Sequence, residues 1–264
     1  SPMAYVTVYA ASPEFFWKHR DWGLYEGPAR SYTLGDGYLY LMNPSRSSPW
    51  HERMMNQYRE VITGMSFSGV HIDQYGYPAS AYTSERAVSA SRVDLAKLFA
   101  EFVDDSKAAC VDARPGASVV FNCVNDWPTD QIARTQAEPV YIEVWPPHDT
   151  YADIVQIVDR ARSASGGKSV VIAAYLSPRH IEAVRYLDAV IFASGGSHIE
   201  LGEGLTMLAD PYFPKYEHVG PELAGILRSY YDFAVRYWDL LGCSAAVAGD
   251  TAVDIPGYQV STCL

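Results

Sequence analysis

The sequence predicts an α/β fold in which parallel strands alternate with helices. Short apolar runs rich in β-branched residues recur along the chain, and segments with apolar residues at helical spacing separate them. This alternation is typical of parallel strands joined by crossover helices and differs from the pattern of a hairpin protein. The 264 residues are enough for one large domain, and 48% hydrophobic residues can fill a sizeable core.

The first half of the chain predicts three strands and two helices. The strand runs are short and apolar, whereas the helical segments repeat apolar residues at helical spacing, as Met54, Met55, Tyr58 and Ile62 do. In chain order the elements are expected at residues 3–10, 49–63, 68–73, 91–106 and 118–124, of which the first, third and fifth are strands.

A long connection, residues 11–46, precedes the first helix and is rich in Trp, Tyr, Gly and Asp. Irregular segments of this length are usually functional or contain small strands of their own. We expect a short strand at residues 39–41.

The second half of the chain predicts three more strands and three helices. Glycine pairs at 166–167 and 195–196 mark loops between them. The strands are expected at residues 139–144, 169–175 and 189–193, and the helices at 151–163, 178–187 and 221–241.

The charge balance argues against several classes of partner. The chain has 31 acidic and 20 basic residues, for a formal net charge of −11, a sign that repels phosphate backbones and anionic lipid surfaces. No apolar run approaches the roughly 18 residues of a membrane-spanning helix, and the first residues lack the pattern of a signal peptide. We therefore expect no nucleic-acid partner and no membrane association.

Cysteines and histidines give no metal or cofactor motif. The four cysteines are far apart in sequence without a C-x-x-C pair, which favours buried thiols over a zinc or dithiol site. The histidines are too scattered to suggest a metal site, and no P-loop, G-x-S-x-G or H-E-x-x-H motif is present. We expect neither a metal nor a cofactor.

Polar residues at strand ends are the candidates for chemistry, because parallel α/β folds place reactive groups at the carboxyl ends of strands. His71 and Asp73 end one run on the same face, and Glu143 shares a face with Tyr141 and Trp145 at the end of another. Two acids at strand ends, among amides and aromatic rings, are what glycoside hydrolysis requires. Asp73 and Glu143 are the expected pair.

Structural roles compete with this interpretation. An Asp at a strand end often caps a helix, His71 is compatible with a hydrogen-bonded core histidine, and Asn122 and Asn125 are compatible with loop stabilisation. Glu143 is the strongest functional candidate, because an unpaired carboxylate in an apolar strand is costly.

A glycine-rich segment, residues 195–204, follows the last expected strand. Its spacing is not that of a dinucleotide-binding loop, and its two carboxylates would repel phosphate. We expect a loop that shapes the substrate site.

Motifs distributed along nearly the whole chain together resemble one known family. They are MAY at 3–5, WGLY at 22–25, NP at 43–44, GVHIDQYG at 69–76, FNCVN at 121–125, YIEVWP at 141–146, AAY at 173–175, DAVIFA at 188–193, HIELGE at 198–203 and YYDF at 230–233. This combination is similar to glycoside hydrolase family 66, which contains endo-dextranases and cycloisomaltooligosaccharide glucanotransferases.

The resemblance implies a (β/α)8 TIM-type barrel, of which this chain would hold about six of eight βα units. The motif order implies that its first strand corresponds to the third of the barrel. A partial catalytic domain would span 1–241, and residues 242–264 would be a C-terminal stub leading toward a β domain. The chain thus resembles part of a larger protein, so activity of this part alone is not implied.

The resemblance also implies a retaining mechanism on dextran or another α-1,6-glucan, with Asp73 as nucleophile and Glu143 as acid/base. Trp145 and Tyr75 would stack on glucose rings. The full set of expected substrate contacts is His71, Gln74, Tyr75, Asn122, Asn125, Tyr141, Trp145, Tyr175, His198 and Glu200. A polymeric substrate implies an extracellular enzyme, which we expect to be monomeric.

Cyclising members of the family carry a carbohydrate-binding insertion after the AAY motif, whereas only a short segment separates Tyr175 from Asp188 here. This difference favours an endo-dextranase over a cycloisomaltooligosaccharide glucanotransferase, although the sequence is compatible with both. The sequence is also compatible with a noncatalytic glucan-binding protein, and with an unrelated α/β enzyme whose acid pair is coincidental.

Overall fold

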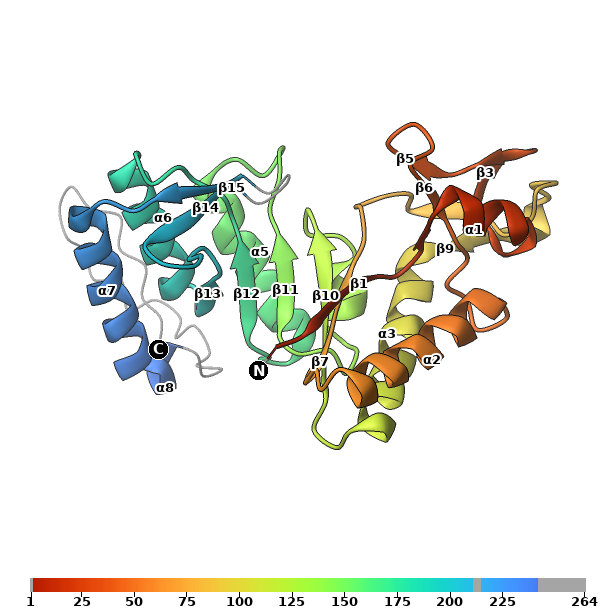
Figure 1. Ribbon diagram of the computed structural model, residues 1–264. Helices are drawn as coiled ribbons and strands as arrows, with labels where there is room; N and C mark the ends of the chain where they lie inside the picture. Colours follow the sequence, from red (N-terminus) through yellow and green to blue (C-terminus); the bar gives the residue numbers. More distant parts are fainter. Residues whose placement is uncertain (1, 211–214, 242–264) are drawn as a thin grey trace. The chain divides into compact units, whose positions relative to one another are not determined.

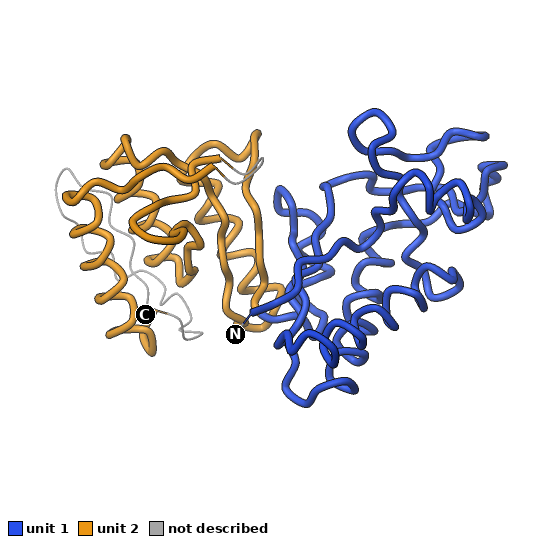
Figure 2. The backbone as a smooth tube through the Cα atoms, viewed as in Figure 1, with its two compact units in different colours: residues 1–138 blue, residues 139–264 orange. Residues whose placement is uncertain are grey.

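The computed structural model describes residues 2–210 and 215–241. The chain divides into two compact units, residues 1–138 and 139–264 (Figures 1 and 2). The stub expected at 242–264 lies outside the described residues. No helix in the described part of the chain is long and apolar enough to cross a membrane.

Unit 1 contains a sheet of three parallel strands: β1 (Ala4–Thr7), β7 (Gly69–Asp73) and β10 (Ser118–Val124). The central strand β7 pairs with both others, so that Tyr5 of β1 and Val120 of β10 lie opposite His71. This register brings the carboxyl ends of the three strands together.

Two long helices of unit 1 begin at well-formed caps. In α2 (Pro49–Gly64), Ser48 caps the N-terminus and proline occupies the first position, while Asp94 caps α3 (Leu95–Ala113). The helices pack against each other, and α3 also packs on β10 (Figure 1). Both predicted helices are confirmed, although α3 begins and ends several residues later than expected.

The long connection folds into short elements and antiparallel strands. Its strand at Leu39–Leu41, β6, is confirmed and pairs with β2 and β5, while β3 pairs with β4 and with β8 of a later loop. The small elements of unit 1 are β2 (Ala10–Ala11), α1 (Pro13–Lys18), η1 (Arg20–Trp22), β3 (Tyr25–Gly27), β4 (Arg30–Ser31), β5 (Thr33–Leu34), β8 (Ser80–Tyr82), η2 (Ser89–Ser91), β9 (Arg92–Asp94) and α4 (Thr129–Ile132).

Unit 2 contains three further parallel strands, with β12 paired to β11 and β13. A hydrophobic cluster of Val184, Met207, Val219, Leu223 and Leu227 joins α6, the β14–β15 hairpin and α7. The elements are β11 (Val140–Glu143), α5 (Tyr151–Ser165), β12 (Val170–Ala173), α6 (Ile181–Ala193), β13 (Gly196–His198), β14 (Thr206–Asp210), β15 (Lys215–His218), α7 (Pro221–Arg236) and α8 (Trp238–Leu241).

The strand predicted at residues 189–193 is wrong, because these residues complete α6. Their apolar side chains continue the helical repeat of Val184, Leu187 and Ile191, all buried, and no helix breaker precedes Gly195, which has a φ of 77°. The sixth strand is β13, only three residues long.

The fold class is confirmed as a partial (β/α) barrel. In the described residues, six parallel strands, three in each unit, alternate with helices along the chain. Cys110 and Cys123 are buried, as expected, and Cys243 and Cys263 lie outside the described residues.

Candidate active site

Asp73 is the last residue of β7, and both of its carboxylate oxygens accept hydrogen bonds. Nδ2 of Asn122 donates to Oδ1 at 2.8 Å, and the hydroxyl of Tyr5 donates to Oδ2. The donors come from the two strands that flank β7, so the parallel register creates this arrangement. Burial raises the pKa of Asp73, whereas the hydrogen bonds from Tyr5 and Asn122 act in the opposite direction.

His71 lies two residues before Asp73 on the same strand face and is half-buried. Its ring centroid is 5.9 Å from that of Tyr5. Unit 1 therefore brings together an acid, an amide, a phenol and an imidazole at one end of its sheet. This combination offers a nucleophile and groups that can bind sugar hydroxyls.

Gln74, which was expected to contact substrate, bonds to the backbone of two loops. Its side chain is buried, and Nε2 donates to the backbone oxygens of Asn122 at 3.1 Å and Trp127 at 3.0 Å. Its Oε1 accepts from the backbone N–H of Gly76 at 2.5 Å. Gln74 thus fixes the loops after β7 and β10, because its amide bonds to the backbone of both.

The two remaining candidates of unit 1 are half-buried loop residues. The backbone N–H of Tyr75 donates to the hydroxyl of buried Tyr9 at 2.9 Å, and that hydroxyl donates to the carbonyl of Tyr77 at 2.7 Å. Asn125 follows β10 with a φ of 53°, a conformation that asparagine tolerates better than most residues. Both side chains keep part of their surface accessible.

In unit 2, Glu143 is the last residue of β11 and is half-buried. The hydroxyl of Tyr175 donates to its Oε1 at 2.9 Å. Because Glu143 pairs with Ala173 in the sheet, Tyr175 extends from just beyond the adjacent strand end. Tyr141 and Trp145, both half-buried, alternate with Glu143 along the chain.

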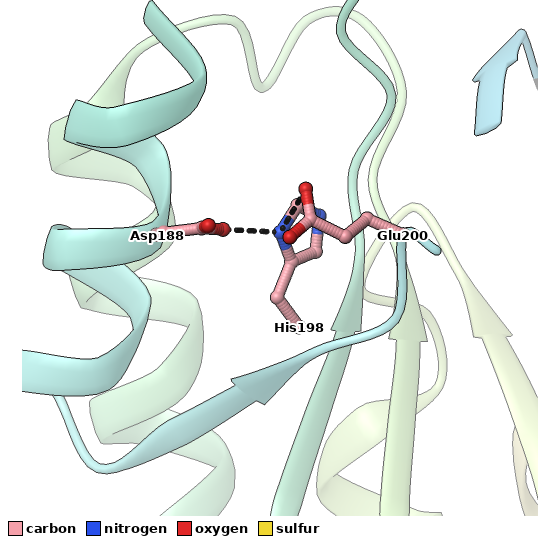
Figure 3. Close-up of side chains that lie close together, drawn as sticks. All are labelled: Asp188, His198 and Glu200. Atoms are coloured by element: carbon pink, nitrogen blue, oxygen red, sulfur yellow. Dashed lines mark hydrogen bonds and ion pairs between the residues drawn. The ribbon is translucent and has the colours of Figure 1, made fainter. Parts of the chain in front are cut away.

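His198 and Glu200, which were expected to contact substrate, are both buried, and their side chains contact protein groups (Figure 3). His198 Nδ1 lies 2.7 Å from Oδ1 of Asp188, and Nε2 lies 2.9 Å from the carbonyl oxygen of Ala174. The hydroxyl of Tyr231 donates to Oε1 of Glu200 at 2.9 Å. His198 and Glu200 thus belong to a buried hydrogen-bond network with Asp188 and Tyr231.

Burial and charge shift the protonation of this network. Burial lowers the pKa of His198, but the hydrogen bond to Asp188 and the charge of Glu200 outweigh it and leave the pKa raised. Burial raises the pKa of Glu200 to about 7, with His198 acting against it and Asp188 acting with it. Burial also raises the pKa of Tyr231.

The same three side chains have the donor types of a metal site. One ligand atom from each of Asp188, His198 and Glu200 lies within 4.8 Å of the others. However, the 2.7 Å between Nδ1 and Asp188 Oδ1 is a hydrogen-bond distance. Bonds of about 2.0–2.1 Å would separate two ligands of a tetrahedral zinc ion by about 3.3 Å. We assign the cluster as a hydrogen-bonded network.

Tyr5, Asp188 and Tyr231 bond to side chains of the candidates and were absent from the expected site. Tyr5 lies in a predicted strand, but its bond to Asp73 depends on the register between β1 and β7. Asp188 and Tyr231 lie on helices, and only the packing of those helices brings them to His198 and Glu200.

A family model and two curated relatives all place similarity in the same family. The family model described as Glycosyl hydrolase family 66 matches residues 1–259. A cycloisomaltooligosaccharide glucanotransferase of Niallia circulans is 29% identical over 189 residues, which are 66% of this chain and 19% of that protein. A dextranase of Streptococcus salivarius is 21% identical over 262 residues, which cover 82% of this chain and 31% of that protein.

A solved structure has the same fold. The crystal structure of a Paenibacillus sp. cycloisomaltooligosaccharide glucanotransferase complexed with cycloisomaltoheptaose matches with a TM-score of 0.85 at 19% identity. The match covers 94% of this chain and 56% of that chain. This chain spans between 19% and 31% of the length of the two curated relatives.

Proposed function

Because the chain belongs to glycosyl hydrolase family 66, we propose that it cleaves α-1,6-glucosidic bonds of dextran with retention of configuration. Asp73 is the nucleophile and Glu143 the acid/base in this proposal. The observation that carries it is the carboxylate of Asp73, held at both oxygens at the end of a parallel strand. A polymeric substrate of this kind is degraded outside the cell, and we extend the proposal to an extracellular location.

The reaction proceeds by double displacement. Glu143 donates a proton to the glycosidic oxygen while Asp73 attacks the anomeric carbon, which releases one end of the glucan and leaves a glucosyl ester on Asp73. Ionised Glu143 then removes a proton from water, and the resulting attack on the ester releases the second product.

The hydrogen bonds of each carboxyl group suit these roles. Donors from Asn122 and Tyr5 orient Asp73 and favour its ionised form, which is the nucleophile. The hydroxyl of Tyr175 donates to Oε1 of Glu143 at 2.9 Å and so orients this carboxyl group for proton transfer. Half-buried Trp145 and Tyr75 are the proposed stacking surfaces for glucose rings.

Cyclising transfer is the second candidate function, because two proteins similar to this chain are named cycloisomaltooligosaccharide glucanotransferases. In this variant a hydroxyl of the same glucan replaces water as the acceptor. The short segment between Tyr175 and Asp188 favours hydrolysis, since it leaves no room for an inserted module there.

Product analysis on dextran tests the proposal. Hydrolysis produces linear isomaltooligosaccharides with new reducing ends, whereas cyclising transfer produces rings that are one water lighter by mass spectrometry. Asp73→Asn and Glu143→Gln, in the full chain, should each abolish cleavage. Dextran binding without any product, or full activity of both variants, would overturn the proposal.

A further inference from the structure

We propose that Asp188, His198, Glu200 and Tyr231 form a positioning group that aims the hydroxyl of Tyr175 at Glu143. The inference rests on the proposed function, because that function makes Glu143 the acid/base. The four side chains come from α6, α7, the end of β13 and the segment that follows it. All of the contacts used here lie within unit 2.

The imidazole of His198 is fixed from both sides. Its Nε2 bonds to the backbone carbonyl of Ala174 at 2.9 Å, and its Nδ1 bonds to a carboxylate oxygen of Asp188 at 2.7 Å. A carbonyl oxygen only accepts, so Nε2 donates the bond to Ala174, and Nδ1 faces the carboxyl group of Asp188. The ring is buried and faces two carboxyl groups, those of Asp188 and Glu200.

The link from His198 to the site passes through one peptide group. The carbonyl of Ala174 and the N–H of Tyr175 belong to the same planar unit. Tyr175 lies beyond the end of β12 at Ala173, so the strand ladder does not by itself fix its direction. The bond from His198 fixes the plane of this peptide group, and the Tyr175 side chain then extends to Glu143 Oε1 at 2.9 Å.

Glu200 and Tyr231 hold the histidine in place. Oε2 of Glu200 lies 3.4 Å from Nδ1 of His198, and Oε1 accepts from the hydroxyl of Tyr231 at 2.9 Å. The same hydroxyl lies 3.3 Å from the backbone carbonyl oxygen of His198. Tyr231 therefore connects α7 to the backbone of His198 and to the carboxyl group of Glu200.

Stability alone is a poor explanation for such a network. Buried ion pairs are expensive to desolvate, and apolar residues of similar volume often replace them without loss of stability. A role in orientation accounts for the use of polar groups, because hydrogen bonds fix direction and apolar packing does not.

A double-mutant cycle in the full chain tests this coupling. We compare kcat and KM on dextran for His198→Gln, Tyr175→Phe and the double variant. His198→Gln should lower kcat by about 10- to 100-fold with little change in KM, since misplacement of an acid/base partner affects the chemical step. The double variant should be no slower than the slower single variant, because both changes disrupt the same hydrogen bond from the Tyr175 hydroxyl to Glu143.

His51 provides a matched control. It is also a buried histidine, 7% exposed like His198, with Nδ1 2.8 Å from a backbone carbonyl and Nε2 3.2 Å from Asp105. It lies on α2 in unit 1 and bonds to residues of that unit, whereas Tyr175 and Glu143 belong to unit 2. The effects of His51→Gln and Tyr175→Phe on kcat should therefore multiply.

Thermal unfolding of each variant distinguishes a folding defect from a displaced Tyr175 hydroxyl. If His198→Gln does not fold, Asp188→Asn, which keeps the side-chain volume, takes its place in the cycle. Two results would overturn the positioning role and leave the proposed function intact. One is that the effect of the His198 or Asp188 change on kcat multiplies with that of Tyr175→Phe. The other is that the His198 or Asp188 change leaves kcat undiminished. A wild-type chain that does not cleave dextran would overturn both.

Discussion

The side-chain amide of Asn122 donates a 2.8 Å hydrogen bond to Oδ1 of Asp73, across two adjacent parallel strands. Asn122 is itself buried and its backbone carbonyl accepts from Gln74, so the donor is held firmly. The bond favours the ionised form of a carboxyl group whose pKa is raised by burial. The protonation of Asp73 should therefore depend on the residue at position 122.

Asn122→Asp tests this dependence with little change in volume. It replaces the donor by a second carboxyl group, which raises the pKa of Asp73 further because two adjacent carboxylates repel. The acidic limb of the kcat/KM profile on dextran should move to higher pH. Asn56→Asp, an exposed site on α2 with the same change in charge, is the control. An unmoved acidic limb in Asn122→Asp would contradict the expectation.

Tyr5→Phe removes only the hydroxyl that donates to Oδ2 of Asp73. A hydrogen bond to a charged group contributes about 1.5–3 kcal/mol, so kcat/KM should fall by roughly 10- to 100-fold. Tyr38→Phe, at a tyrosine that is 74% exposed, should leave kcat/KM unchanged. Equal activity of the two variants on dextran would show that the Tyr5 hydroxyl does not support the nucleophile.

Glu200→Gln should flatten the pH dependence of stability. A carboxyl group whose pKa rises on folding contributes stability that is present below its ordinary pKa of 4.5 and is lost as the pH rises through about 7. The Tm of the wild-type chain should therefore fall relative to that of Glu200→Gln between these pH values. Calorimetry measures the difference, with exposed Glu203→Gln as control. A Tm gap that is constant with pH would rule out titration of Glu200 in this range.

Removal of divalent cations should leave the unit 2 network intact. The 2.7 Å between His198 Nδ1 and Asp188 Oδ1 is a hydrogen-bond distance and is shorter than the separation of two ligands on a zinc ion, so EDTA should leave Tm unchanged. Zinc added to the EDTA-treated chain should also leave Tm unchanged. A zinc-dependent rise in Tm that Asp188→Asn abolishes would instead assign a metal site here.

Polar residues at the ends of apolar runs predicted the two acids of the candidate site, whereas the contacts between distant residues could not be predicted in this way. Asp73 and Glu143 end apolar runs, and both end strands in the structure. The bond from Tyr5 to Asp73 depends on register, and the bond from Tyr231 to Glu200 depends on helix packing. Neither quantity is encoded in a local pattern.

The sixth strand shows a second limit of prediction from local sequence. Residues 189–193 are as apolar as a buried strand, but they also continue a helical repeat, and short apolar runs fit either structure. The actual strand, β13, consists of Gly196, Ser197 and His198, which have little strand propensity of their own. Pairing with β12 decides its conformation, so local composition could not identify it.

Gly69→Ala tests how tightly unit 1 requires its strand pairing beneath Asp73. A Cβ at Gly69, the first residue of β7, would overlap the backbone carbonyl oxygen of Ser118, its partner on β10. Because backbone atoms in a paired sheet have little freedom to shift, we expect a loss of about 1–3 kcal/mol in the free energy of unfolding. The strand displacement should also weaken the bond between Asn122 and Asp73, so kcat should fall as well.

Gly64→Ala, at the last position of α2, is the matched control. No atom lies within 4 Å of a Cβ at that position, and alanine is favoured over glycine in helices by roughly 0.5–1 kcal/mol. Urea unfolding of the two variants should therefore move the midpoint in opposite directions, down for Gly69→Ala and slightly up for Gly64→Ala. Equal midpoints would mean that β7 and β10 can separate at no cost, in which case the register could not hold Asn122 against Asp73.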